Sequence, residues 1–136
     1  ATRSLMLLAA LSGEEVYQKA AEDSLKAIQE TLAQYPTAFG SWLLAFDLAL
    51  NPYRQVAIVW DAEAPADQIA ALTTIAQKKY RPRLVLACAS LPVPTKSPEL
   101  LRDRATLNNA PTAYVCQHFV CQLPVTDPEA LRRQLE

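Results

Sequence analysis

The chain has 136 residues, of which 51% are apolar and 20% are charged, and its formal net charge is −1. This length and composition are enough for one small domain with a buried core and exclude a disordered chain. The balanced charge gives no long-range attraction for nucleic acid or anionic lipid, and no apolar run reaches the length of a membrane span. We therefore expect neither a nucleic-acid partner nor a membrane partner.

Residues 1–52 are predicted to form a helical segment. The chain starts at Ala1 within a helical pattern, which indicates a piece of a longer protein. A first helix is expected to end near Leu11. Ser12 and Glu15 have the spacing of a capping box, in which the Ser12 hydroxyl accepts from the Glu15 amide and starts the next helix.

Two further helices follow in this segment. The first carries one apolar stripe at spacings of three and four and should end at Pro36, with Thr37 placed to cap the second. The second, over residues 38–50, is apolar on nearly all sides and must be covered from more than one direction. We expect a helical layer without all of its neighbours, whose uncovered faces favour a homodimer.

Residues 53–136 are predicted to form a small α/β domain. Strands at 55–60 and 83–88 flank a helix at 67–80, which is the pattern of a parallel βαβ unit. Three prolines make residues 91–98 a loop, and Ser97 and Pro98 should start a short helix that runs to residue 104.

The last part of this domain is predicted to be a hairpin and a helix. Turn residues at 108–111 lead into strands at 112–117 and 119–123, which are close enough that only a tight hairpin can join them. Thr126 and Glu129 are spaced as a capping box for the final helix.

The order strand, helix, strand, helix, strand, strand, helix is that of the thioredoxin fold. Pro111 stands directly before the third strand, where thioredoxins have a cis-proline. Thioredoxin catalysis needs two cysteines at the start of the helix after the first strand. Here residues 61–66 read Asp-Ala-Glu-Ala-Pro-Ala, without cysteine. We predict a thioredoxin-like scaffold that lacks the dithiol; a small molecule would bind in a groove between Pro111, Asp61 and Pro65.

Cys116 and Cys121 are the remaining residues with reactive chemistry, and His118 lies between them. Three interpretations compete for these cysteines: they pack as small hydrophobic residues, they form a redox-active or disulfide-bonded pair, or they bind a metal. We favour packing, because the neighbours are apolar and because Cys-x-His-x-x-Cys supplies at most three ligands. The odd number of three cysteines predicts no disulfide framework and favours a reducing, cytoplasmic compartment.

Other polar residues receive structural interpretations. Asp47 looks partly buried and is interpreted as a hydrogen-bonded helix residue, because no second carboxylate at matching spacing faces it. The basic cluster of Lys78, Lys79, Arg81 and Arg83 is interpreted as the solvent-facing end of a helix and not as a phosphate-binding patch. Two glycines are too few for a phosphate loop, so neither a cofactor nor a metal is predicted.

The tail at residues 111–129, PTAYVCQHFVCQLPVTDPE, resembles the closing segment of the spermatogenesis-associated protein 20-like, thioredoxin-domain-containing family. That family typically ends in the pattern Y-V-C-x-x-x-x-C-x-x-P-V-T-D-P. Residues 36–47 and 54–59 also look like the family's last toroid helix and the strand after it. The resemblance implies an N-terminal thioredoxin-like domain with the redox motif, an (α/α) toroid similar to glycan-processing epimerases, and then this C-terminal part.

The resemblance implies organisation more than activity. We predict a non-catalytic accessory domain that packs on the toroid, its partners being the remaining domains of the full-length chain. One alternative is a redox module in which Cys116 and Cys121 exchange with the N-terminal domain. The other is a small-molecule binding module, with a carbohydrate-related ligand as one option.

Overall fold

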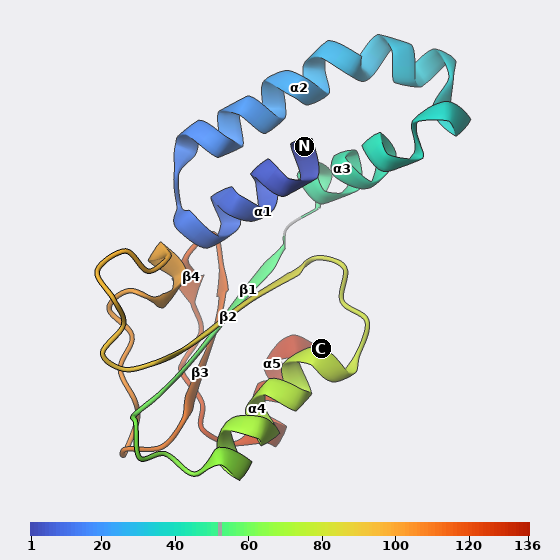
Figure 1. Cartoon of the computed structure of the whole chain (residues 1–136). Coiled ribbons are helices and arrows are strands. Elements are labelled where there is room, and N and C mark those ends of the chain that lie inside the picture. Colours follow the sequence, from blue (N-terminus) through green and yellow to red (C-terminus); the bar gives the residue numbers. More distant parts are fainter. Residues whose placement is uncertain (52) are drawn as a thin grey trace.

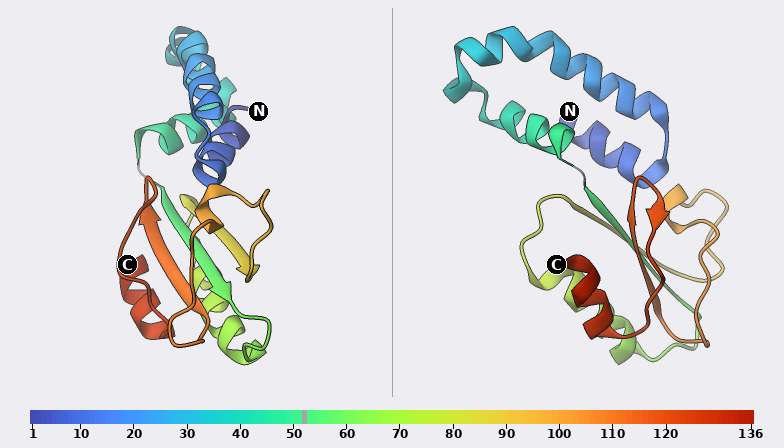
Figure 2. Two further views of the ribbon diagram at one scale, coloured as in Figure 1. Left: turned by 90° about the vertical axis from the view of Figure 1, so that its left-hand side faces the viewer. Right: turned by 180° about the vertical axis from the view of Figure 1, so that it is seen from behind.

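The computed structural model describes residues 1–51 and 53–136 of the chain. Within these residues there are five α-helices and one four-stranded mixed sheet. The first three helices form an arm at one end of the sheet, and the last two lie against one of its faces (Figures 1 and 2). The fold class is mixed α/β, as the sequence predicts.

The arm consists of three α-helices and one 3-10 turn. Their bounds are α1 Thr2–Ser12, α2 Glu15–Gln34, the 3-10 turn Pro36–Phe39 and α3 Gly40–Leu50. α1 ends where Gly13 adopts a φ of 74° and donates its N–H to the Ala9 carbonyl. This left-handed conformation costs glycine little, since it has no Cβ.

Two predicted caps in the arm are wrong. The Ser12 hydroxyl donates to the Leu8 carbonyl at 2.8 Å and accepts from the Glu14 amide at 3.2 Å, so it closes α1 and makes no capping box with Glu15. Thr37 lies inside the 3-10 turn, and α3 begins without a side-chain cap. The end of α1 uses the Ser12 hydroxyl, because serine side chains bond readily to nearby backbone.

The sheet has the strand order β2-β1-β3-β4. The bounds are β1 Arg54–Trp60, α4 Ala66–Lys78, β2 Leu84–Ser90, β3 Thr112–Gln117, β4 Val120–Cys121 and α5 Pro128–Leu135. β1 runs parallel to β2 and antiparallel to β3, and β3 is antiparallel to β4. The predicted parallel unit and the predicted hairpin are both confirmed.

Three apolar clusters hold these elements together. Along β1 the side chains alternate, so that Val56 and Ile58 face α4 and α5, whereas Ala57 and Val59 face α1 and the 3-10 turn Glu99–Leu101. The third cluster lies within the arm, between α1, α2 and α3. Tyr53 packs against both the second and the third cluster and so joins the arm to the sheet.

Three predictions for the second half are wrong in detail. The helix expected at 97–104 is only a 3-10 turn over Glu99–Leu101, because Arg102 takes an extended conformation and Asp103 follows with a left-handed φ of 54°. The second hairpin strand, expected at 119–123, has two residues, since Phe119 belongs to the turn. α5 is capped by Asp127 instead of Thr126, and the Asp127 carboxylate accepts from the Ala130 amide at 2.8 Å.

The cis peptide bond expected before Pro111 is also a wrong prediction. Among the described residues, the cis bond lies between Leu91 and Pro92. Asn108 and Asn109 take left-handed φ values of 52° and 57°, so these turn residues reverse the chain before β3, as the turn chemistry predicts.

Candidate functional site

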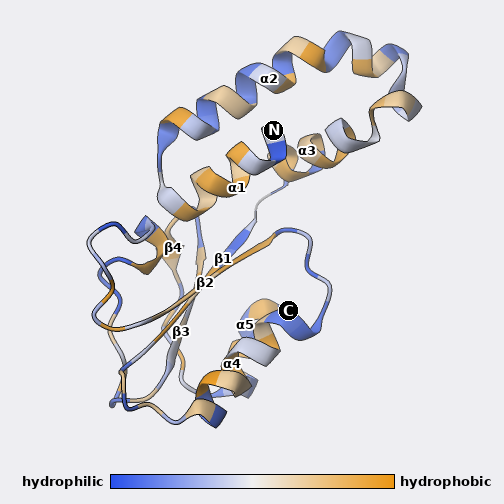
Figure 3. Cartoon of the chain, viewed as in Figure 1, coloured by the Kyte–Doolittle hydropathy of each residue, from blue (hydrophilic) through white to orange (hydrophobic). Residues whose placement is uncertain are grey.

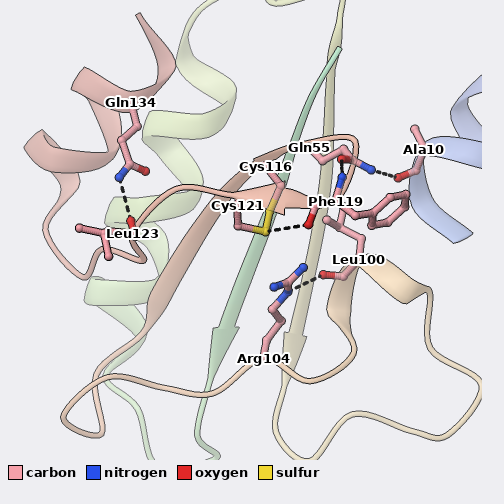
Figure 4. Close-up of a disulfide and its surroundings, with 9 residues drawn as sticks. All are labelled: Ala10, Gln55, Leu100, Arg104, Cys116, Phe119, Cys121, Leu123 and Gln134. Atoms are coloured by element: carbon pink, nitrogen blue, oxygen red, sulfur yellow. Dashed lines mark hydrogen bonds between the residues drawn. A yellow bond between two sulfur atoms is a disulfide. The ribbon is translucent and has the colours of Figure 1, made fainter. Parts of the chain in front are cut away.

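The centre of the site is Gln55, a fully buried glutamine on β1. Its side-chain N–H donates to the Ala10 carbonyl of α1 at 2.6 Å, and its side-chain oxygen accepts from the Phe119 amide at 2.8 Å (Figure 4). The Ala10 carbonyl belongs to the last turn of α1, where carbonyls have no partner within the helix. One side chain therefore satisfies a helix end and a hairpin turn that are far apart in sequence.

The hairpin between β3 and β4 presents that amide. Gln117 pairs with Val120, so the connection is a two-residue turn made of His118 and Phe119. Their φ values are 49° and 62°, as a type I′ turn requires. Neither residue is a glycine or an asparagine, and a left-handed conformation costs such residues roughly 1–2 kcal/mol each. Interactions around the turn must offset this cost.

A disulfide closes the same turn. Cys116 lies directly opposite Cys121 in the register of β3 and β4, and their sulfurs are joined (Figure 4). Cys116 is buried and Cys121 is half-buried, with its sulfur 3.6 Å from the Phe119 carbonyl oxygen. The favoured interpretation of two packed free thiols is wrong. Sequence spacing allowed both arrangements, and the directly opposed register is what permits the bond.

Phe119 also packs against the end of α1. A Cβ built on Gly13 would lie 3.6 Å from the Phe119 ring and 3.4 Å from Glu99. His118 places its ring 6.0 Å from that of Tyr53, next to the arm. The turn thus contacts the arm through the Gln55 amide and through ring packing, and the disulfide restrains the turn.

This arrangement can couple the oxidation state of the hairpin to the attachment of the arm. Opening the disulfide would remove one restraint on the turn that presents the Phe119 amide to Gln55. The third cysteine, Cys88, is a free cysteine at an exposed position of the edge strand β2. Partial burial of its sulfur raises the pKa of the Cys88 thiol, which makes it a weak nucleophile at neutral pH.

The three residues of the predicted groove lie in different environments. Pro111 is buried, whereas Pro65 is exposed at the start of α4. Asp61 accepts a hydrogen bond from the Thr106 hydroxyl at 2.7 Å. The groove therefore stays a prediction, with its one carboxylate held by a neighbouring hydroxyl.

Asp47 has the structural role that was expected, in a more exposed place. Its side chain is 52% exposed, pairs with Arg83 at 3.5 Å and accepts from the Asn51 amide at 3.0 Å. Among the described residues no group of three potential metal ligands occurs. Within the same residues no helix combines the length and the apolar character needed to cross a membrane.

The arm carries an apolar surface that the rest of the chain does not cover. On α3 the side chains of Leu43, Leu44 and Leu50 are 43%, 60% and 78% exposed. Figure 3 shows α1 and α3 as largely hydrophobic ribbons, whereas hydrophilic and hydrophobic residues alternate along α2. We call Leu43, Leu44 and Leu50 the α3 leucine face.

Gln55 was not among the site residues predicted from the sequence. A signal was present, because a glutamine begins an otherwise apolar strand of the sequence QVAIVW. A polar side chain in a buried run needs hydrogen-bond partners, so this position indicates a specific contact. The partners themselves, Ala10 and Phe119, lie too far away in sequence for any local pattern to name them.

A known protein is similar in sequence to most of this chain. No family model and no solved structure matches the chain. The chain is 28% identical to human "Spermatogenesis-associated protein 20" over 135 residues, which cover 97% of this chain. The matched region spans 17% of that relative's length. The similarity supports a relation to the spermatogenesis-associated protein 20 family.

Proposed function

We propose that this chain is a non-catalytic accessory domain of a larger protein, and that it docks on that protein through the α3 leucine face. The observation that carries the proposal is the exposure of this face on a helix that is apolar on nearly all sides. Three neighbouring exposed leucines on one helix are typical of an interface.

The occupant we propose for the face is a helical part of the same larger protein. The relative is much longer than this chain, which spans 17% of its length. A neighbouring helix supplies apolar side chains at matching spacing and leaves no backbone group unpaired. In this proposal residues 1–52 are the end of an (α/α) toroid, and residues 53–136 are the domain that follows it.

We further propose that residues 53–136 are thioredoxin-like. The strand order β2-β1-β3-β4, with β1 parallel to β2 and β3 antiparallel to its neighbours, supports this. So does the placement of α4 and α5 on one face. The loop between β1 and α4 contains no cysteine, so the domain would not catalyse thiol–disulfide exchange there.

The test compares the 136-residue chain with the full-length protein. Changing Leu44 and Leu50 to Gln should leave the stability of the isolated chain within about 0.5 kcal/mol, since both side chains are exposed there. In the full-length protein the same variant should lower the melting temperature by several degrees. Val16→Gln is the matched control, because Val16 is 65% exposed on α2.

Three results would contradict the docking proposal. The first is an unchanged melting temperature of the full-length protein in the double variant. The second is an equal drop in melting temperature with Val16→Gln. The third is a dimer of the isolated chain that persists in the full-length protein and dissociates in the double variant, which would assign the face to self-association. Sedimentation of both proteins at several concentrations measures this last outcome.

A further inference from the structure

A cleft of about 390 Å³ lies where β1 and β2 begin, and Gln117, the residue after Cys116, is part of its lining. A second hollow, of about 280 Å³, shares Arg81 and Glu136 with it. The basic residues that line the two hollows are Arg54, Lys78, Lys79, Arg81, Arg83 and Arg132. They come from β1, from the end of α4 and the loop after it, and from α5.

The charge at this place differs from that of the whole chain. The chain has a net charge of −1 and 13 basic residues, six of which gather around these hollows. Three carboxylates pair with them: Glu136 with Lys79 at 3.2 Å, Asp47 with Arg83 at 3.5 Å, and Glu129 with Arg132 at 3.1 Å. The local excess is therefore positive, and a concave surface concentrates its field.

Two of the three arginines in the cleft are anchored on backbone carbonyls, the third sits in an exposed ion pair, and all three still have donors left. Arg54 donates from Nη1 to the Gln134 carbonyl at 3.1 Å, and Arg81 donates from Nη1 to the Ile75 carbonyl at 3.3 Å. Arg83 uses Nη1 for its ion pair with Asp47. Within the described part of the chain, the hydrogen bonds of these three side chains use Nη1 alone.

Helix capping explains only part of this arrangement. Arg81 caps the end of α4, as the interpretation of the basic cluster expects, and Arg54 bonds to a carbonyl near the end of α5. Each cap uses one nitrogen of a guanidinium that carries five N–H donors. The remaining donors of an anchored side chain lose little conformational entropy when a ligand binds.

We propose that this cleft binds a small ligand that carries phosphate or carboxylate groups, held by Arg54, Arg81 and Arg83. The volume lies in the range of small-molecule sites, and the planar guanidinium matches an oxyanion with two parallel hydrogen bonds. Glu136 lies in the same cleft and pairs with Lys79, so an incoming anion competes with this carboxylate.

Calorimetric titration of the 136-residue chain with inorganic phosphate and, separately, with citrate tests the proposal at low salt. Arg83→Gln should weaken binding at least tenfold, since a charge-assisted hydrogen bond is worth about 1.5–3 kcal/mol. Arg102→Gln is the matched control, because Arg102 also sits in an exposed ion pair, with Glu99 at 3.0 Å, and does not line the cleft. It should change binding less than twofold.

Circular dichroism melts of both variants check that each remains folded. Tighter binding of phosphate would indicate a phosphorylated ligand, and tighter binding of citrate a carboxylated one; either supports the proposal. Absence of binding by both anions at millimolar concentration would overturn it. So would an equal loss in Arg83→Gln and Arg102→Gln, because net charge alone would then explain the binding.

Discussion

Replacing Gln55 by leucine removes both hydrogen bonds at the junction of arm, sheet and hairpin while it keeps the volume of the side chain. The Ala10 carbonyl would be left without a partner in a fully buried place, and the Phe119 amide would lose its acceptor. Each buried group left unpaired costs about 1–3 kcal/mol. The added apolar burial returns roughly 1 kcal/mol. With about 2 kcal/mol for each of the two groups, we expect a net loss of about 3 kcal/mol, a large share of the roughly 5–15 kcal/mol typical of a domain.

Urea denaturation followed by tryptophan fluorescence measures this loss. Trp42 lies in the arm and Trp60 at the end of β1, so the two reporters cover both parts of the fold. With a slope of roughly 1.5–3 kcal/mol per molar, the midpoint should fall by about 1–2 M. Gln122→Leu is the matched control, because Gln122 is exposed, and we expect it to stay within about 0.5 kcal/mol of the wild type.

Glutamate at position 55 sharpens the test, since only its protonated form donates to the Ala10 carbonyl. Burial and the facing carbonyl should raise its folded pKa above the unfolded value of about 4.3. The folded state would then bind more protons, so stability is greatest at acidic pH and falls as the pH rises above about 4.3. A loss below 1 kcal/mol in Gln55→Leu, or a pH-independent Gln55→Glu, would refute the bridging role.

Three further predictions concern the cysteines and the half-buried Tyr53. Reduction of Cys116–Cys121 should lower the free energy of unfolding by about 2 kcal/mol, because the link removes the loop entropy of five residues from the unfolded chain. A reductant should leave the stability of the double variant Cys116→Ala/Cys121→Ala unchanged. A wild type whose stability does not respond to the reductant would contradict this prediction. In the native oxidised chain one thiol, Cys88, should react with a thiol reagent, and at pH 7 it should react more slowly than free cysteine because its pKa is raised. A second reactive thiol, or a reaction as fast as that of free cysteine, would refute this. Desolvation raises the pKa of Tyr53, so above about pH 10 the folded state keeps a proton that the unfolded state releases. The urea midpoint should therefore fall as the pH rises above about 10, and it should fall less in Tyr53→Phe. The same dependence of the midpoint on pH in both proteins would argue against the effect.

Local patterns predicted most elements of this fold. Apolar runs bounded by turn residues located β1, β2 and β3 to within two residues, because short apolar runs rich in β-branched residues leave a clear signal. Asn108 and Asn109 marked a turn, since both tolerate left-handed backbone. Cap assignments failed at Ser12, Thr37 and Thr126: the neighbouring Asp127 caps α5, whereas α2 and α3 begin without a side-chain cap.

The candidate site was less accessible from the sequence. The tight hairpin followed from the short spacing of its strands, and Cys116 and Cys121 were recognised as a pair. Their state was interpreted wrongly, because an apolar neighbourhood fits a packed thiol and a disulfide equally well. Phe119 gave no turn signal, since bulky residues seldom take positive φ.

By itself, the sequence determined the class of the fold, the order of its elements and the absence of a dithiol between β1 and α4. These properties depend on residue type and on short-range periodicity, which remain readable without coordinates. The tertiary structure decided that Gln55 joins α1 to the hairpin, that Cys116 and Cys121 are bonded, and that the α3 leucine face is uncovered. Each of these depends on which distant segments come together, and that is settled by packing and hydrogen bonding between segments that carry no mark of one another in the sequence.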